Sequence, residues 1–382
     1  MFDRPVPLSL YVHIPWCLRK CPYCDFNSHR TQGCPDAHGY VRALLADLEL
    51  ELPLAGGRRV ETLFIGGGTP SLFPPEAIRT LLLGIGRRVE LAVEAEVTME
   101  ANPGALEAGR FTAYREARVN RLSLGIQSFD DEALRALGRV HDAAQARRAI
   151  GEAAAAGFDS LNLDLMFGLP GQDAAAARRD LEQALAFAPD HISYYQLTVE
   201  HNTAYHRAPP PLPPEDTLAR MQEEGEERLE GAGYRQYEVS AYARPGRRCR
   251  HNLNYWRFGD YIGIGAGAHG KLTDAPGQAV WRRWRLRHPT AYLDAAGGEA
   301  ALGGGRRLER DDLIAEFMLN ALRLNEGFDL ALFEARTGLS RAVLASRLTR
   351  EEARGLLRLE GARVRPTRQG RRFLNDLVSA FL

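Results

Sequence analysis

The sequence predicts an α/β fold in which βα units build a parallel sheet, followed by an α+β extension. Six short runs rich in β-branched and aromatic residues alternate with amphipathic helical patterns over the first half of the chain, and such alternation is typical of βα units. A proline-rich stretch at 209–214 then interrupts the pattern, and helices and strands no longer alternate after it. We therefore expect a change of domain at this stretch.

Each predicted strand is a short apolar run that ends at a glycine, a proline or a polar residue. The run 8–14 is an example, because it contains Tyr11 and Val12 and stops at Pro15. The helical segments between the strands carry apolar residues at spacings of three and four, with charges on the opposite face. The predicted strands are 8–14, 60–65, 95–101, 121–126, 160–166 and 191–198, and the predicted helices are 40–54, 75–87, 106–117, 130–137, 143–156 and 174–187.

The extension ends in a small unit of helices and a hairpin. The tail shows three short helical patterns, a hairpin with Gly361 at its turn and a last helix, which together resemble a winged-helix unit. Ahead of this tail we expect helices at 215–232 and 311–324, an alternating strand at 234–242 and an exposed strand at 281–287. The predicted domains are 1–208, 209–325 and 326–382.

The composition is that of an ordinary globular protein. The chain has 382 residues, of which 45% are apolar and 26% are charged, and its formal net charge is zero. No overall charge draws it to nucleic acid, and because the tail lacks a distinct basic helix we favour a covering or docking role for the tail. No apolar run approaches the ~20 residues of a membrane-spanning helix. We expect a cytoplasmic protein, with peripheral contact to a membrane left open.

Three cysteines form the most distinctive pattern in the chain. Cys17, Cys21 and Cys24 follow the first predicted strand with the spacing C-x3-C-x2-C. Thiolates are soft ligands that suit iron–sulfur clusters, zinc and copper(I), and a closed zinc site needs four ligands. Three cysteines on a four-iron cluster leave one iron open to a small molecule. The alternatives are a disulfide with one free thiol, or a zinc site that also uses His13 or His29.

Polar and glycine residues follow the other predicted strands. Glycines 66–68 follow the second strand, and Glu100, Gln127 and Asp164 lie at or near the ends of later ones. Because the carboxyl ends of parallel strands meet at one edge of a sheet, we expect these residues to lie beside the cysteines. The alternative interpretations are a tight glycine turn and an internal ion pair, such as one between Arg139 and Asp164.

The cysteine spacing, the strand before it and Tyr23 ahead of the last cysteine are similar to the signature of radical S-adenosylmethionine (SAM) proteins. The resemblance implies a [4Fe–4S] cluster whose open iron binds the amino and carboxylate groups of SAM. It also implies that the core is an incomplete (β/α)6 radical SAM barrel, which agrees with the six predicted strands. The α+β extension with its winged-helix-like unit completes the expected fold.

Further segments resemble the oxygen-independent coproporphyrinogen III oxidase family over nearly the whole chain. The matching segments are 11–28, 65–71, 99–104, 125–129, 162–170 and 251–256. Some SAM contacts in that family belong to a second SAM molecule, and whether one or two molecules bind here is left open. The SAM contacts that the resemblance implies are Tyr11, Tyr23, Gly67, Gly68, Thr69, Glu100, Gln127, Arg139, Asp164 and Thr198.

Two departures favour the haem chaperones of this family over its oxidases. The oxidases carry a further cysteine two positions after the third, where this chain has Phe26, and they have a long segment before the cluster loop. The resemblance then implies a protein that binds haem and delivers it to haem-acceptor proteins, including respiratory-chain subunits at the membrane. A homodimer is left open. The alternative is a radical SAM oxidase that decarboxylates two propionates of a tetrapyrrole in porphyrin biosynthesis.

The extension contains a second motif. Residues 251–256 match the pattern H-N-x-x-Y-W that is associated with haem binding in the chaperones. An imidazole suits axial ligation of haem iron, and His269 and Cys249 are other candidate ligands in the same region. The alternative is a packed, hydrogen-bonded loop in which the histidine is structural. The haem-binding residues that the resemblance implies are His251, Asn252, Tyr255 and Trp256.

Overall fold

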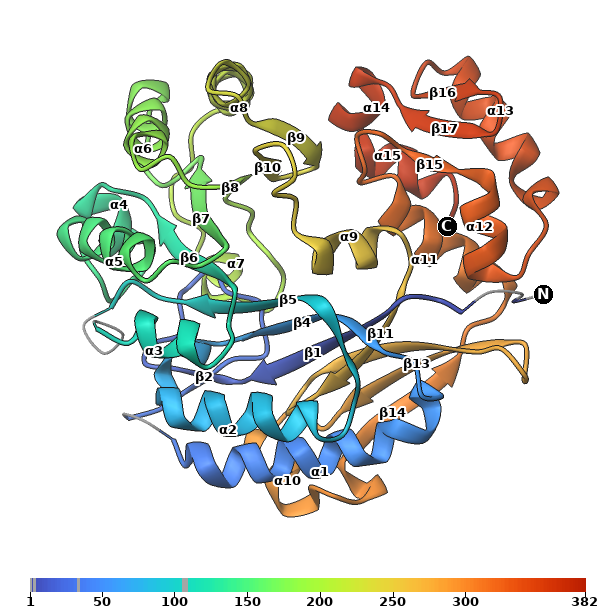
Figure 1. The fold of residues 1–382 in the computed structure, drawn as a ribbon. Coiled ribbons are helices and arrows are strands. Elements are labelled where there is room, and N and C mark those ends of the chain that lie inside the picture. Colours follow the sequence, from blue (N-terminus) through green and yellow to red (C-terminus); the bar gives the residue numbers. More distant parts are fainter. Residues whose placement is uncertain (1, 3–4, 33–34, 105–108) are drawn as a thin grey trace.

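A computed structural model describes residues 2, 5–32, 35–104 and 109–382. Through this part of the chain runs one large sheet with the strand order β14-β13-β12-β11-β1-β4-β5-β6-β7-β8-β10-β9 (Figure 1). The six strands predicted for the βα units are confirmed, and they lie side by side in parallel. They are β1 (Leu8–Ile14), β4 (Val60–Gly67), β5 (Leu91–Ala101), β6 (Arg121–Gln127), β7 (Ser160–Phe167) and β8 (His191–Gln196).

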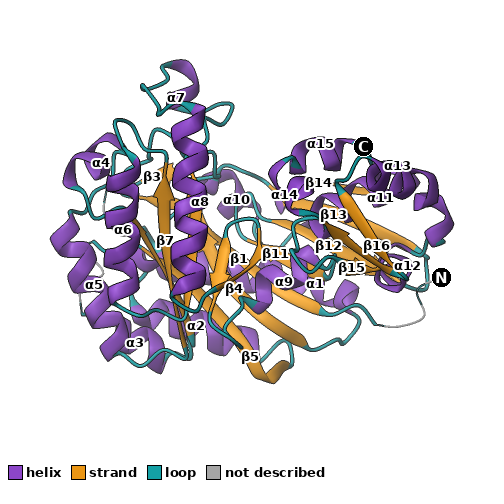
Figure 2. Ribbon diagram, turned by 90° about the horizontal axis from the view of Figure 1, so that it is seen from above, coloured by secondary structure: helices purple, strands orange, loops and turns teal. Residues whose placement is uncertain are grey.

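The helices of the βα units cover the outside of this curved sheet (Figure 2). Their apolar faces pack on the strands, and side chains such as Leu44, Ile78 and Ile150 are fully buried there. Aspartates begin several of these helices, because a carboxylate accepts hydrogen bonds from the first free amides, as Asp142 does from Gln145. The helices are α1 (Ala37–Ala55), α2 (Pro75–Gly86), α3 (Phe111–Glu116), α4 (Asp131–Ala136), α5 (Ala143–Ala155) and α6 (Ala174–Ala186). The start of the helix predicted at 106–117 lies outside the described residues.

The extension continues the same sheet at both ends. Strand β11 (Asp260–Ile264) pairs in parallel with β1, and β12 (His269–Asp274), β13 (Ala279–Arg285) and β14 (Leu302–Arg307) follow it as antiparallel neighbours. The sheet remains open, because β14 and β9 lie at its opposite ends. The remaining short elements of this part are β2 (Trp16–Cys17), β3 (His29–Arg30), η1 (Pro70–Leu72), α7 (Ala204–Arg207), α8 (Glu215–Gly231), α9 (Arg250–Trp256), α10 (Pro289–Ala295) and η2 (Glu299–Ala301).

Two strand predictions for the extension need correction. The single strand expected at 234–242 is in fact two antiparallel strands, β9 (Arg235–Glu238) and β10 (Ala241–Ala243), because the chain turns at residues 239–240. The strand expected to be exposed at 281–287 is exposed at Trp281 but not at Arg285. The Arg285 guanidinium is buried against α1 of the barrel, where its Nε lies 2.6 Å from Asp47 Oδ1 and its Nη2 lies 2.7 Å from Glu51 Oε1. Burial of this cation depends on both carboxylates.

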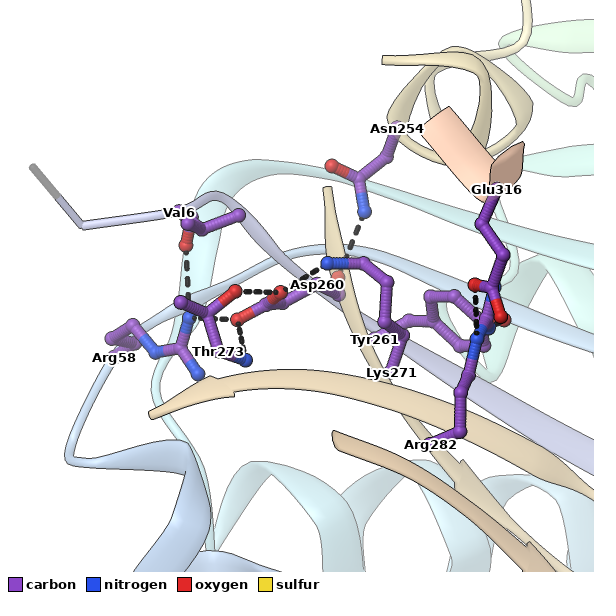
Figure 3. A network of polar contacts seen from close by, with 9 residues as sticks. All are labelled: Val6, Arg58, Asn254, Asp260, Tyr261, Lys271, Thr273, Arg282 and Glu316. Carbon is purple, nitrogen blue, oxygen red and sulfur yellow. Dashed lines mark hydrogen bonds and ion pairs between the residues drawn. The ribbon is translucent and has the colours of Figure 1, made fainter. Parts of the chain in front are cut away.

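A second buried network ties the extension to the barrel (Figure 3). Asp260, at the start of β11, accepts hydrogen bonds from Lys271 at 2.8 Å and from Arg58 at 2.7 Å. Arg58 belongs to the turn before β4, and Lys271 belongs to β12. Further along, Arg282 of β13 pairs with Glu316 at 2.6 Å. The extension is therefore held against the barrel by paired charges as well as by strand pairing.

The C-terminal unit has a core of its own around Phe317, Phe333 and Val364. Its three strands pair antiparallel in the order β15-β17-β16, and β16 and β17 form the predicted hairpin with Gly361 at its turn. The division of the chain at residues 208 and 325 stays a prediction. The elements are α11 (Arg310–Ala321), β15 (Phe328–Asp329), α12 (Leu330–Thr337), η3 (Arg341–Leu344), α13 (Ala345–Ala353), β16 (Leu357–Glu360), β17 (Arg363–Pro366), α14 (Arg368–Arg372) and α15 (Leu374–Ser379).

Candidate functional site: a cysteine loop and an adjoining cavity

The cysteine loop leaves the end of β1 and is closed by a short parallel pairing of β2 with β3, in which Cys17 faces Arg30. Cys17, Cys21 and Cys24 are half-buried free thiols, with no disulfide between them. Burial raises the pKa of the Cys17 thiol to about 11. Gly68 approaches the loop so closely that an added Cβ would lie 3.0 Å from Cys17 Sγ and 2.5 Å from the Trp16 carbonyl oxygen. A glycine is therefore required at this contact.

A chain of hydrogen bonds positions two of the thiols from the strand ends. The Thr69 hydroxyl donates to Cys17 Sγ at 3.3 Å, and Asn102 Nδ2 donates to Thr69 Oγ1 at 3.1 Å. Arg139 Nη2 in turn donates to Asn102 Oδ1 at 2.6 Å, while its Nη1 lies 3.8 Å from Cys21 Sγ. This series of hydrogen bonds ends at Cys21. Residues that follow β4, β5 and α4 therefore hold the cysteine loop at both Cys17 and Cys21. Asn102 was not predicted as a site residue, although it directly follows the third predicted strand.

His13 orients the cysteine loop. Its Nε2 lies 2.8 Å from the Asn27 carbonyl oxygen and its Nδ1 lies 2.9 Å from the Tyr11 hydroxyl. Burial lowers the pKa of His13 to about 4, so the neutral ring donates from Nε2 and accepts at Nδ1. Both nitrogens are engaged, and the zinc site that would use His13 is not favoured. His29, the other candidate, lies with its Nε2 3.3 Å from Asn27 Oδ1.

Asn27 links the cysteine loop to the extension, and sequence reasoning did not select it. Its Nδ2 donates to the carbonyl oxygens of Ala266 at 3.0 Å and Arg287 at 2.9 Å. Gly267 has φ +77°, and a Cβ on it would lie 2.2 Å from Asn27 Nδ2. The loop and the extension are therefore in direct contact at a position where only glycine fits without strain.

The donor set fits an iron–sulfur cluster. Within the described ranges, no three His, Cys, Asp or Glu side chains are grouped so that they could hold a single metal ion. A four-iron cluster differs from a single ion because each cysteine binds a separate iron, and thiolates are its usual ligands. The three thiols, the close glycine contact and the neighbouring Arg139 suit a cluster of net negative charge.

Glu100 lies beside the glycine stretch that follows β4. The Gly67 amide donates to Glu100 Oε2 at 3.2 Å. Burial, together with the nearby charge of Asp164, raises the pKa of Glu100 to about 8. Asp164 is held by Ser123 at 3.1 Å and Asn162 at 2.8 Å, and it makes no ion pair with Arg139 among the described residues. The ion-pair alternative for these two residues is therefore wrong, and Glu100 lines the cavity described below.

Three other predicted SAM contacts lie on separate elements of the barrel. Tyr23 belongs to the loop and packs near Tyr205, with ring centroids 6.4 Å apart. Gln127 ends β6 with φ +67° and accepts a hydrogen bond from the Tyr195 hydroxyl at 2.8 Å. Thr198 is exposed beyond the end of β8 and donates to Glu200 at 2.8 Å. The structure does not bring Thr198 to the cavity described next.

A cavity of about 510 Å³ adjoins the cysteine loop and lies between the barrel and the extension. Phe26, the position that replaces a fourth cysteine, is 63% exposed and contributes to its wall. Three predicted SAM contacts and the last two residues of the H-N-x-x-Y-W motif face the same space. The lining residues are Tyr11, His13, Phe26, Asn27, Gly67, Glu100, Tyr255, Trp256, Phe258, Gly259, Tyr261, Gly267, His269, Lys271, Arg282, Arg287 and Asn320.

The H-N-x-x-Y-W motif lies on helix α9 and not in a loop. His251 is fully buried, with Nδ1 2.8 Å from Thr62 Oγ1 and Nε2 2.9 Å from the Tyr255 hydroxyl. Burial, with a smaller effect of Arg121, lowers the pKa of His251 to about 3. His251 and Asn252 are absent from the cavity wall, which Tyr255 and Trp256 line. The last two residues of the motif therefore line the cavity, whereas the first two do not.

Comparison with known proteins agrees with this architecture. The radical SAM superfamily model matches residues 11–184, and the HemN C-terminal domain model matches residues 308–373. The chain is 49% identical to the heme chaperone HemW of Escherichia coli K12 over 98% of both chains, and 45% identical to that of Haemophilus influenzae over 98% of both. It is 36% identical to the mitochondrial radical S-adenosyl methionine domain-containing protein 1 of Bos taurus, over 98% of this chain and 87% of that protein.

A solved structure confirms the predicted fold class. The coproporphyrinogen III oxidase HemN of Escherichia coli, a radical SAM enzyme, superposes with a TM-score of 0.83 at 25% sequence identity. The superposition covers 99% of this chain and 90% of the oxidase. The barrel, the extension and the C-terminal unit are therefore arranged as in that enzyme.

Proposed function

Because this chain belongs to the HemW family of haem chaperones within the radical SAM superfamily, we propose that it binds haem and delivers it to proteins that require haem. The observation that carries the proposal is the cavity of about 510 Å³ beside the cysteine loop. Its volume falls in the range of about 300–1,000 Å³ that is usual for sites of small molecules and cofactors. Aromatic side chains and cations line it together, and these suit the apolar ring system and the two propionates of haem.

We propose that Cys17, Cys21 and Cys24 hold a [4Fe–4S] cluster. When bound, such a cluster supplies one iron that is open to the amino and carboxylate groups of SAM. Thr69 and Arg139 support this assignment, because they place hydrogen-bond donors on the sulfur atoms of Cys17 and Cys21. Donors of this kind orient and tune metal ligands.

We place SAM between the cysteine loop and the cavity. Gly67 and Gly68 bring backbone close to the loop, and Glu100 offers a carboxyl group beside them. Tyr11 and Glu100 line the cavity wall, so a nucleoside bound between the loop and the cavity would contact them. On the family resemblance we propose further SAM contacts at Tyr23, Thr69, Gln127, Arg139, Asp164 and Thr198. Of these, Thr198 has the least support from its position.

The acceptors of haem and the assembly of the protein are also proposals. We propose respiratory-chain subunits at the membrane as acceptors, reached by peripheral contact, and a homodimer as the working form. In the described part of the chain, no helix has the length and apolar character needed to cross a membrane. We expect no role for nucleic acid, since the formal net charge of the chain is zero.

A radical SAM oxidase of coproporphyrinogen is the second candidate. The superposition with HemN at a TM-score of 0.83 favours it, and the residues of the barrel rim suit either function. Phe26 weighs against the oxidase, because the resembling oxidases have a cysteine at this position. The full-length match to haem chaperone relatives also weighs against it.

The deciding experiment uses the full chain after anaerobic reconstitution of the cluster. The haem chaperone should hold haem with a Soret band that persists through gel filtration, and it should transfer that haem to an apo-acceptor. The same preparation, given SAM, a reductant and coproporphyrinogen, should release no vinyl-bearing product. Detectable vinyl product would overturn the proposal in favour of the oxidase, and failure to retain haem would overturn it as well.

A further inference from the structure

The cavity offers one histidine with free ring nitrogens. Among the described residues, its wall contains two histidines, His13 and His269. Both nitrogens of His13 are engaged by Tyr11 and Asn27. His269, at the start of β12, has no hydrogen-bond partner on either ring nitrogen among the residues that the structure describes, and its ring stacks on Trp284 with centroids 6.2 Å apart. This arrangement leaves both ring nitrogens available to a ligand.

The other candidate ligands, His251 and Cys249, do not line the cavity. His251 is buried with both nitrogens hydrogen-bonded, so iron ligation would break one of these bonds. Cys249 is buried with its thiol 3.5 Å from Glu96 Oε1, and burial raises its pKa to about 12. A thiol with this pKa is a poor source of thiolate. Neither residue lines the cavity.

The cations around His269 differ in their availability. Lys271 is committed to Asp260 at 2.8 Å, and Arg282 to Glu316 at 2.6 Å. Arg287 lines the same cavity, is exposed, and has no ion-pair partner among the described residues. A free guanidinium at a cavity mouth suits a carboxylate, to which it can donate two parallel hydrogen bonds. Burial, with Arg282 and Arg287 nearby, lowers the pKa of His269.

From these contacts we infer that His269 is the axial ligand of haem iron in this cavity and that Arg287 binds a haem propionate. His251 is then a positioning residue, which fixes the Tyr255 hydroxyl and so the wall of the cavity. This assignment rests on the proposed haem binding and adds the iron ligand and the recognition of the carboxylate to it.

The test of the iron ligand compares haem complexes of the reconstituted full chain. His269→Gly should shift the Soret band, change the electron paramagnetic resonance of ferric haem, and weaken binding by at least about tenfold. Added imidazole should enter the space left by the side chain and restore the wild-type spectrum. His251→Ala should keep the wild-type Soret position while the protein loses thermal stability. His38→Ala, at an exposed histidine of α1, is the matched control and should behave as wild type.

A wild-type spectrum and affinity in His269→Gly would overturn the ligand assignment, as would a Soret shift in folded His251→Ala that imidazole reverses. Failure of the wild type itself to bind haem would instead overturn the proposed function, which keeps the two failures distinct.

The propionate contact is tested with haem and haem dimethyl ester. Wild-type protein should bind haem more tightly than the ester, because esterification removes the carboxylates. Arg287→Met should reduce this preference at least several-fold, whereas Arg42→Met, at an exposed arginine of α1, should preserve it. An unchanged preference in Arg287→Met would contradict the contact.

Discussion

His251 and Tyr255 are one turn apart on α9, and His251 Nε2 lies 2.9 Å from the Tyr255 hydroxyl. The histidine is fully buried and also contacts Thr62 of β4, whereas the tyrosine lines the cavity. This pair therefore joins the barrel core to the wall of the candidate haem site. Within the motif associated with haem binding, His251 supports the cavity wall and Tyr255 forms part of it.

The first prediction concerns the stability that this pair provides. His251→Ala removes a buried ring and leaves the Thr62 and Tyr255 hydroxyls without this partner, which should lower the free energy of unfolding by about 2–4 kcal/mol. Chemical denaturation of the two proteins, followed by circular dichroism, measures the difference. An unchanged stability would show that the hydrogen bonds of His251 contribute nothing to the fold.

The second prediction concerns the hydrogen-bond chain between Cys17 and Cys21. Asn102→Ala breaks the links from Thr69 to Asn102 and from Asn102 to Arg139, so the reconstituted protein should lose iron to a chelator several-fold faster than wild type. Asn375→Ala, at an exposed residue of α15, serves as the control. Equal rates of iron loss for all three proteins would show that Asn102 does not support the cysteine loop.

The third prediction concerns pH. The pKa of Glu100 is raised from 4.5 to about 8 by burial and Asp164, so ionisation costs more in the folded protein than in the unfolded one. Below pH 4.5 the group is protonated in both states, and above pH 8 the full cost is present. In the cofactor-free protein, Glu100→Gln should therefore raise the free energy of unfolding above that of wild type. The difference should grow from near zero at about pH 5 to a few kcal/mol above about pH 8.

Thermal unfolding of both proteins at a series of pH values measures this difference. A difference that stays constant with pH would mean that Glu100 has the same pKa in the folded and the unfolded protein, and would contradict the raised pKa. A difference that grows as pH falls would give the wrong sign and would contradict the raised pKa.

The fourth prediction separates haem uptake from haem delivery. Cys21→Ala should lose the cluster, because three thiolates hold it. The haem cavity lies beside the loop and Cys21 is not among the residues that line it, so haem uptake should change little while transfer to an acceptor or dimerisation is impaired. Stopped-flow transfer to an apo-acceptor and gel filtration give the two readouts. Haem transfer at the wild-type rate by a dimeric Cys21→Ala protein would contradict this prediction.

The parts of the molecule that follow from local pattern were predictable from the sequence. Buried strands such as 8–14 and 121–126 are short apolar runs with clear ends, and parallel strands necessarily place the cysteine loop near Glu100. The division of strands β9 and β10 at residues 239–240 was missed, because apolar and polar residues continue to alternate through the turn.

Contacts between distant residues were beyond sequence reasoning. His251 lies 189 positions from Thr62, and Asn27 lies 260 positions from Arg287, and no periodicity reports such pairs. The motif match therefore selected His251 and Asn252 for the haem site although Tyr255 and Trp256 alone reach the cavity. For the same reason His269 and Asn102 gained importance only when the fold placed them beside the cavity and the cysteines.

The central claim is that a cluster held by Cys17, Cys21 and Cys24 lies next to a haem cavity that includes His269. Anomalous scattering at the iron edge from crystals of the reconstituted haem complex tests it most directly. The account predicts a four-iron peak at the three cysteines and a separate single-iron peak within bonding distance of His269 Nε2 or Nδ1. A haem iron bound at His251, or no iron at the cysteines, would contradict it.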